Sequence, residues 1–282
     1  MTLDPSPESN RLPVDIRWSD LSPDPAIVEA LAHAGARPES GDQNAKRRWS
    51  EKFAHACAVA FARELRNCVE LRGKSITPVA IGEGTEALVP LGAGANKRID
   101  VTVVDRILGL EIGLSLKGLN FRDSGGNQFD KNLTGRMYEL ADEVRLVHEW
   151  LPRAFMAAVF FLPIESTQDK TIRAASSFAR TVTNLRERSG RIDPSLAGQA
   201  ARCDSAYVAL YSSGEGASGY PAGVIRLVNV TTPPPRRGRP RVLDTLSIRD
   251  AVEQIVAQAT FSAEAEWGEA EPDSTGDGYS AP

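Results

Sequence analysis

Residues 155–162 form an unbroken apolar run, from Phe155 to a leucine at position 162. A strand that faces water on one side alternates apolar and polar side chains, whereas a strand covered on both faces is apolar throughout. The run is also far shorter than the roughly 20 residues that cross a bilayer. The chain therefore has to place layers on both sides of a sheet, and helices are the usual covering layers in such folds.

The flanking segments supply those helices and further strands. Apolar residues at three- and four-residue steps predict a long helix over residues 44–71, stopped by Gly73 and Pro78. Three more helices are expected, one ending near Trp150 and the others at 170–188 and 247–261, with strands at 99–104, 108–119, 207–212 and 224–230. The predicted fold class is α/β, with a mixed central β-sheet flanked by helices.

Composition divides the chain into three parts. Residues 1–43 are rich in Pro, Ser, Asp and Gly and predict a loosely ordered N-terminal arm. Residues 44–261 carry the periodic patterns of the α/β domain, and residues 262–282 form an acidic tail that is expected to be disordered. The first ten residues lack the features of a secretory signal, and three cysteines make no disulfide framework, so a cytoplasmic protein is expected.

The net charge of −4 comes from that tail. Residues 262–282 hold six acidic residues and no basic one, so the remainder carries 33 basic and 31 acidic residues. A balance near neutral is compatible with nucleic-acid binding through local basic patches, although it does not indicate such binding unaided.

A carboxylate and a lysine fall on two neighbouring predicted strands. If the hairpin turns between Asp105 and Leu108, Asp100 lies opposite residues 113–115. Side chains alternate faces along a strand, so Ser115 and Lys117 share one face. Asp100 and Lys117 should then meet above the sheet.

Phosphodiester hydrolysis requires such a pairing. A carboxylate can hold a divalent cation that neutralises phosphate charge and lowers the pKa of a bound water. A neighbouring lysine can orient that water or stabilise the developing charge. Adjacent strands hold both groups rigidly, as this chemistry demands. The competing interpretation is a solvated cross-strand ion pair.

The pattern resembles the PD-(D/E)XK, or restriction-endonuclease-like, nuclease superfamily. Asp100 matches the family's first aspartate and Lys117 its lysine, while Ser115 stands where the family normally has Glu or Asp. Ile99 stands where a proline often precedes the aspartate. The resemblance implies a restriction-endonuclease-like core, Mg²⁺ as the cofactor with Mn²⁺ as an alternative, and catalytic roles for Asp100, Ser115 and Lys117.

Another acid should replace the one missing at Ser115. Glu111 is on the correct face but lies roughly 20 Å from Lys117 along an extended strand. Glu83 and Glu86 lie in the glycine-rich approach to Asp100, and Glu139 lies on the helix after the second strand. Glu86 is the preferred metal ligand and catalytic acid, with Glu83 and Glu139 as the alternatives.

Polar and basic residues near these strands are candidates for nucleic-acid contact. The predicted set is Arg98, Asn120, Arg122, Lys131 and Arg136. Two basic runs, residues 46–48 and 236–241, could also hold a DNA backbone or could be solvated surface. The three histidines have no spacing typical of a zinc site.

These observations predict a Mg²⁺-dependent DNA endonuclease of restriction or phage-defence type. Its expected partners are DNA and either a second copy of the chain or proteins of a defence system, and no membrane. The alternatives are a catalytically inactive nuclease-like binding module and an adaptor within a defence complex.

Overall fold

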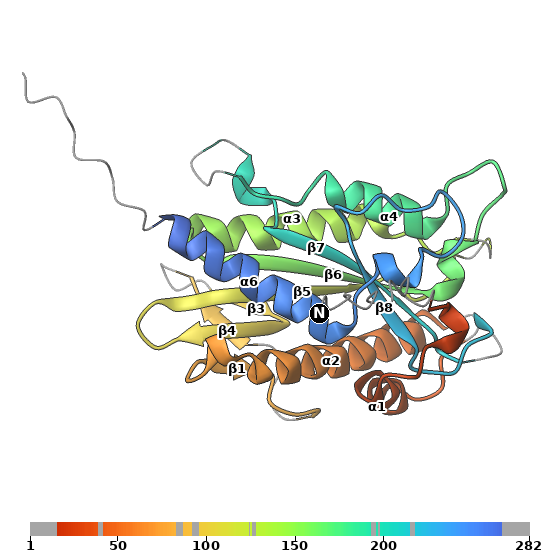
Figure 1. The fold of residues 1–282 in the computed structure, drawn as a ribbon, viewed down its shortest axis with the longest axis horizontal. Coiled ribbons are helices and arrows are strands. Elements are labelled where there is room, and N and C mark those ends of the chain that lie inside the picture. The colour runs from red at the N-terminus through yellow and green to blue at the C-terminus, as the bar shows by residue number, and fades with distance from the viewer. Residues whose placement is uncertain are drawn as a thin grey trace, which may run out of the picture.

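A six-stranded sheet with helices on both faces forms the centre of the protein (Figure 1). The computed structural model describes residues 16–38, 42–82, 87–91, 96–123, 125, 128–192, 196, 198–214 and 218–266. The sheet contains β1 (Ser75–Thr77), β4 (Val101–Asp105), β5 (Gly109–Gly118), β6 (Phe155–Pro163), β7 (Ser205–Tyr211) and β8 (Ile225–Asn229), in the order β1-β4-β5-β6-β7-β8.

The sheet is mixed. Its central strands β5, β6 and β7 run parallel, whereas β1, β4 and β8 pair antiparallel with their neighbours. Every residue of β6 is buried, as the apolar run over 155–162 predicts. The predicted α/β class with a mixed central sheet is confirmed.

Helices cover both faces of the sheet (Figure 1). The helices are α1 (Pro25–Ala34), α2 (Gln43–Asn67), α3 (Leu133–Trp150), α4 (Ser177–Arg186) and α6 (Ile248–Glu266). One apolar core lies between the sheet and α1, α2 and α6, and a second lies between the sheet and α3 and α4. The two cores explain why the middle strand has no polar face.

The long helix α2 forms where the apolar periodicity predicts it. Asp42 caps its first turn, because the Asp42 side chain accepts a hydrogen bond from the amide of Asn44. Its buried side chains include Trp49, Phe53 and Phe61, which recur at helical spacing and face the sheet. The last helix, α6, has the predicted cap: Ser247 Oγ accepts from the amide of Asp250, and Asp250 accepts from the amide of Ser247.

The region before α2 packs more closely than its composition predicts. Ile27 and Ala30 of α1 are fully buried in the core beside α2. Trp18 is also buried, and its indole N–H donates to the carbonyl of Pro240 at 2.8 Å. Although α1 is short, its apolar side chains bury enough surface to hold it against α2. The division into arm, domain and tail stays a prediction, since residues 1–15 and 267–282 lie outside the described part.

Two predicted elements have different bounds. The expected strand over 99–104 is divided at Asp100, because β3 (Asn96–Ile99) pairs with β2 (Ala87–Pro90) in a separate two-stranded sheet. The expected helix over 170–188 begins only at Ser177, where the Ser176 side chain accepts from the amide of Ala179. The preceding loop includes Lys170, whose φ of 65° is incompatible with a right-handed helix.

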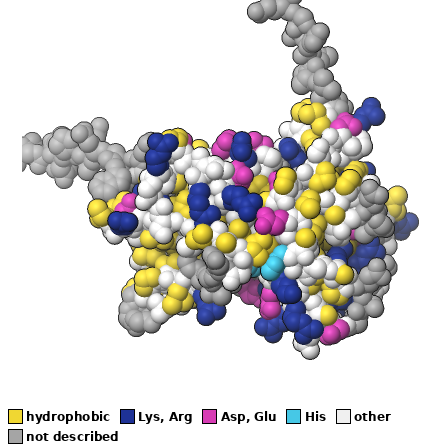
Figure 2. Space-filling model, turned by 90° about the horizontal axis from the view of Figure 1, so that it is seen from below, with side chains coloured by type: hydrophobic (Ala, Val, Ile, Leu, Met, Phe, Trp, Pro, Cys, Tyr) yellow, Lys and Arg dark blue, Asp and Glu magenta, His cyan; other side chains and the backbone are white. Residues whose placement is uncertain are grey.

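Basic, acidic and apolar side chains are interspersed on the face that carries α1 and α2 (Figure 2). This mixture agrees with the near balance of charge in the sequence outside the tail. Within the described residues, no helix combines the length and the apolar composition needed to span a membrane.

Candidate functional site

A cleft of about 1800 Å³ lies at the carboxyl ends of the parallel strands β5, β6 and β7. Its walls include Asp100, Lys117 and Asn120, together with residues of α2 such as Ser50 and Glu51. The carboxyl ends of strands are where open α/β sheets usually bind ligands, because the chain leaves the sheet there in loops.

Asp100 lies at the bend between the two sheets. Its Oδ2 accepts a hydrogen bond from the amide of Leu116 at 2.6 Å, which fixes the carboxylate over the neighbouring strand. Val101 pairs with Leu114, so the next residue back, Asp100, stands opposite Ser115. The turn at residues 106–108 and a one-residue register shift between Val103 and Val104 together produce this pairing, and the predicted juxtaposition of Asp100 with residues 113–115 is confirmed.

Lys117 projects toward the face that α3 covers. Its Nζ donates to Oε2 of Glu143 on α3 at 2.9 Å. Only 12% of the Lys117 side chain and 7% of the Glu143 side chain are exposed. The ion pair is therefore largely removed from water, unlike the solvated surface pair that was the competing interpretation.

Burial and charge have opposite effects on the pKa of Lys117. Desolvation of the ammonium group is the largest influence and lowers the pKa, but the charges of Glu143 and Asp100 and the hydrogen bond to Glu143 together raise it above its ordinary value. Lys117 is thus a cation at neutral pH. A cation suits stabilisation of negative charge, and it does not suit proton abstraction.

Ser115 is fully buried on the same face as Lys117. Its hydroxyl oxygen has no hydrogen-bond partner within the described part of the chain. Serine supplies no carboxylate, and the carboxylate that reaches Lys117 on this face comes from α3.

The acid at that place is Glu143, which the sequence reasoning missed. Glu139, the alternative on this helix, lies one turn earlier, is 54% exposed and pairs with Arg136 at 2.6 Å. The spacing of Glu143, three residues after the buried Leu140 and four before the buried Val147, is the signal that could have identified it. The preferred Glu86 and the alternative Glu83 lie outside the described residues.

Four of the five residues predicted to contact nucleic acid line the cleft. They are Asn120, Arg122, Lys131 and Arg136, and Lys46 and Arg47 of α2 extend the basic set. Arg98 is instead an exposed residue of β3, opposite Leu88 of β2, and it does not belong to the cleft wall. Because the predicted strand is divided at Asp100, Arg98 belongs to the second sheet and not to the strand that carries the cleft residues.

Asn120 ties together three elements at the base of the cleft. Its Oδ1 accepts from the hydroxyl of Tyr211 at 2.9 Å, and its Nδ2 donates to Ser50 at 3.2 Å. Burial raises the pKa of Tyr211, which keeps that hydroxyl a donor. The backbone carbonyl of Asn120 also accepts a hydrogen bond from Arg37. Asn120 is therefore a structural anchor as well as part of the cleft wall.

Arg37 was also missed, because it lies in the stretch expected to be a loose arm. Its guanidinium reaches Ser213 at 3.3 Å and Glu165 at 3.9 Å and stacks over the ring of Phe121. These partners follow β7, β6 and β5, so Arg37 spans the ends of all three parallel strands. A sequence pattern holds no signal for such a contact between distant segments.

The second basic run is mainly structural. Arg237 donates to the carbonyls of Gln168, Asp169, Lys170 and Thr171 at 2.7 to 3.1 Å. These contacts fasten the 236–241 segment to the loop that precedes α4. Little of the Arg237 guanidinium is then available to contact a DNA backbone.

The carboxylates near Lys117 are ligands that suit a hard cation, but they are few. Asp100 and Glu143 both act on the Lys117 ammonium, and carboxylate oxygen is the donor that Mg²⁺ prefers. Among the described residues, no group of three or more His, Cys, Asp or Glu side chains is placed to hold a metal. Mg²⁺ commonly uses only one or two carboxylates and takes its other ligands from water and phosphate, so Asp100 and Glu143 offer the donor chemistry that this ion uses.

The structure thus brings Asp100 and Lys117 together at a cleft and adds Glu143 to them. The restriction-endonuclease-like core and the family resemblance remain predictions. When the chain is compared with models of protein families, with curated proteins and with solved structures, none of them matches it.

Proposed function

We propose that this protein is a Mg²⁺-dependent endonuclease that hydrolyses phosphodiester bonds of DNA, of restriction or phage-defence type. The observation that carries the proposal is the buried cation Lys117, held by Glu143 within the electrostatic reach of Asp100 at the edge of a basic cleft. Desolvating three charged groups is costly. Charged side chains that are desolvated beside a cleft are typical of functional sites.

The residues of the chain would act on a phosphate in the cleft. Asn120, Arg122 and Lys131 lie along the wall, where their donors can position the backbone of a nucleic acid. Lys117 would place its Nζ cation next to a non-bridging phosphate oxygen and stabilise the charge that develops there. Because it is protonated, it would orient the attacking water by donating a hydrogen bond to it.

Asp100 and Glu143 are the residues that would hold the metal ion. Bound Mg²⁺ would supply charge neutralisation at the phosphate and a lower pKa of its bound water. The hydrogen bond from the amide of Leu116 keeps the Asp100 carboxylate in place for this role, and the ion pair with Lys117 does the same for Glu143.

The test is a cleavage assay on plasmid, linear duplex and single-stranded DNA, with and without Mg²⁺. We expect Mg²⁺-dependent cleavage, and a loss of about 100-fold or more in Asp100→Asn and Lys117→Met, as is usual when a group that stabilises the transition state is removed. Circular dichroism melts of the same variants should show that they remain folded.

The matched control is Glu139→Gln. Glu139 lies on the same helix as Glu143, one turn earlier, but is exposed and pairs with Arg136. This variant should cleave like the unchanged protein. Full activity in Lys117→Met would refute the proposal, and so would equal losses in Glu139→Gln and Asp100→Asn.

One observation favours a second candidate, a catalytically inactive nucleic-acid-binding module or adaptor. Within the described residues, the carboxylates at Lys117 are two and not three, and one of them already pairs with the lysine. Such a module would bind DNA but not Mg²⁺. Calorimetric titration with Mg²⁺ separates the two functions, because only the nuclease should show a binding heat that Asp100→Asn abolishes.

A further inference from the structure

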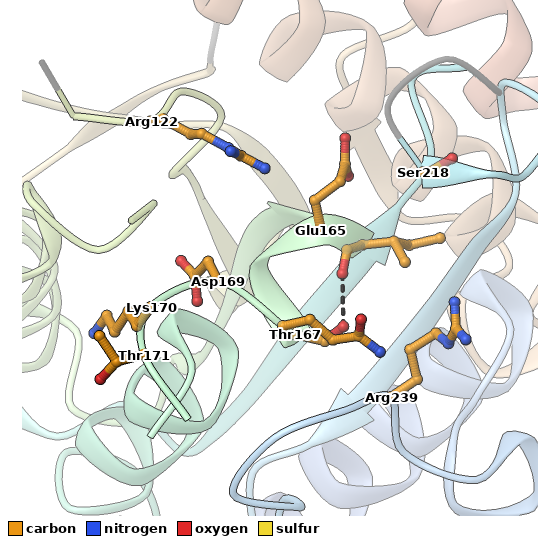
Figure 3. A pocket seen from close by; sticks show the side chains of 10 residues that line it. Arg122, Glu165, Thr167, Asp169, Lys170, Thr171, Ser218 and Arg239 are labelled. Carbon is orange, nitrogen blue, oxygen red and sulfur yellow. Dashed lines mark hydrogen bonds between the residues drawn. The ribbon is translucent and has the colours of Figure 1, made fainter. Parts of the chain in front are cut away.

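A second cavity, of about 490 Å³, opens beside the cleft (Figure 3). Its lining includes Arg122, Glu165, Gln168, Ser218 and Arg239. Arg122 and Glu165 line both the cavity and the cleft, so the two spaces share a wall. The volume lies in the range of about 300 to 1000 Å³ that is typical of sites for small organic groups.

Glu165 stands at this shared wall. It belongs to η3 (Ile164–Thr167), the turn that directly follows β6, and the hydrogen bond from Thr167 Oγ1 to the carbonyl of Ile164 at 2.8 Å holds the turn in shape. In Figure 3 its carboxylate points between Arg122 on one side and Ser218 on the other. The turn therefore presents an acidic group to whatever enters the cavity.

The Glu165 carboxylate is only partly satisfied. Its side chain is 9% exposed, and its Oε1 lies 3.9 Å from Nη1 of Arg37, too far for a hydrogen bond. Its Oε2 is buried and has no hydrogen-bond partner among the residues that the structure describes. A buried acceptor without a donor destabilises a fold. A ligand that donates a hydrogen bond to Glu165 would therefore gain binding free energy.

Two arginines flank this acceptor. The guanidinium of Arg239 lies 5.0 Å from the ring centre of Tyr220, and that of Arg122 lies 5.3 Å from the ring centre of Phe129. Stacking on a ring holds the plane of a guanidinium, and its several N–H donors can serve more than one acceptor. The lining also includes Asp169, which accepts from backbone amides, and Lys170, which pairs with Asp130. The cavity thus combines the partly satisfied Glu165 acceptor with the cations of Arg122 and Arg239.

We propose that this cavity receives one unpaired nucleobase of the nucleic-acid substrate and that Glu165 recognises an exocyclic amino group on its edge. The inference rests on the proposed function, because it assumes that a nucleic acid occupies the adjoining cleft. An ionised carboxylate only accepts hydrogen bonds, so it can pair with the exocyclic amino group of cytosine (N4), adenine (N6) or guanine (N2). Arg122 and Arg239 bind the phosphate of the same nucleotide.

The base must be unpaired, because in a duplex the amino N–H is open only to the major groove, and a cavity of about 490 Å³ takes a single nucleotide and not a base pair. The substrate is therefore single-stranded at this position, or its nucleotide is turned out of the helix. Glu165 is a specificity residue in this scheme and takes no part in bond cleavage.

The test compares two nucleotides that differ only at this edge. dCMP carries an amino donor at position 4 and an acceptor at N3, whereas dUMP carries a carbonyl acceptor at position 4 and an N–H donor at N3, so a preference for dCMP reports the exocyclic amino group. With the full chain in EDTA, calorimetric titration should show dCMP binding about tenfold tighter than dUMP, the usual effect of one hydrogen bond to a charged group. No variant is needed for this first measurement, and equal affinities would overturn the inference.

Variants then assign the preference to Glu165. Glu165→Gln should bind both nucleotides alike, because a glutamine amide can donate as well as accept. Arg239→Ala should weaken both nucleotides by the same factor and keep their ratio. Glu149→Gln, which changes an exposed acid of α3 that lines neither the cleft nor the cavity, should behave like the unchanged protein. A preference for dCMP that survives in Glu165→Gln contradicts the inference.

The outcome is independent of the outcome for nuclease activity, because no metal is present and nothing is cleaved. A protein that prefers dCMP but cleaves no DNA would keep the nucleobase site and lose the proposed activity. A protein that cleaves DNA but does not distinguish dCMP from dUMP would keep the activity and lose the nucleobase site.

Discussion

At Lys117, burial and charge act in opposite directions on one ammonium group. The net pKa is above the ordinary value of 10.5, because the charges and hydrogen bond of its acidic neighbours outweigh desolvation. A lysine with a raised pKa stabilises the fold at all pH values below 10.5, and this stabilisation is lost as the pH rises through the folded-state pKa. The ion pair with Glu143 is therefore intact over the whole neutral range.

Glu143→Gln tests this balance directly. The substitution removes the strongest of the charges that raise the pKa of Lys117, while desolvation, which lowers it, remains. We expect the pKa of Lys117 to fall, which an NMR titration of lysine Nζ can measure, and cleavage at neutral pH to fall by about 100-fold. Alanine at the same position should cost about 3 kcal/mol in the free energy of unfolding, since it leaves a buried cation unpaired.

Glu139→Gln is again the control for that experiment. Its charge has the smallest of the influences on the pKa of Lys117, so the titration should move only slightly. An unchanged Lys117 pKa in Glu143→Gln would mean that Glu143 does not hold the lysine.

At the scale of elements, the segment 236–241 shows how similar residues take different roles. Arg237 makes four hydrogen bonds to backbone carbonyls of the loop before α4, whereas the exposed Arg239 lies on the ring of Tyr220. The carbonyls need these donors because their loop belongs to no helix or strand. Arg237 therefore holds the segment 236–241 against the loop, and Arg239 faces the cavity.

The two arginines therefore predict opposite results. Arg237→Ala should lower the free energy of unfolding by about 2 to 4 kcal/mol, since several carbonyls lose a charged donor. Arg239→Ala should change it by less than about 0.5 kcal/mol. Thermal melts decide the matter, and a larger drop in melting temperature for Arg239→Ala than for Arg237→Ala would reverse the assignment.

Much of this arrangement follows from local pattern, and the remainder depends on contacts between distant segments. The turn at residues 106–108 is local, so the sequence places Asp100 opposite residues 113–115 correctly, but the register shift between Val103 and Val104 that selects Ser115 within this range was not predicted. The division of the strand at Asp100 depends on pairing with β2, which no local pattern reveals. Glu143 and Arg37 reach the cleft only through the packing of α3 and of the segment after α1, and sequence reasoning passed over both.

At the scale of the whole molecule, the acidic tail and the basic cleft carry charges of opposite sign. The last fully or nearly buried residue of α6 is Val256, and residues 261–263 are exposed. Six acidic residues follow Phe261. Their charge raises the cost of bringing a polyanion to the cleft, an effect that salt screens over about 10 Å at 0.1 M.

Truncation after Phe261 should leave the melting temperature within about 2 °C, because residues 261–263 are exposed and Trp267 and Tyr279 are the only large apolar residues in the removed sequence. Non-specific DNA binding should tighten at low salt, and the difference from the full chain should shrink as salt rises. Fluorescence anisotropy over a salt series measures both effects. A large drop in melting temperature would show that the tail packs against the domain.

The candidate chemistry occupies one continuous stretch, since Asp100, Lys117 and Glu143 all fall within residues 100–143. The groups that face the substrate around it come from widely separated segments, such as Arg37 and Arg239. A genetic exchange with both breakpoints outside that stretch would transfer all three groups at once and leave the surrounding wall behind. If the proposed activity holds, such a chain can acquire a new target in evolution by exchanging its outer segments, while the segment with the three proposed active-site residues stays intact.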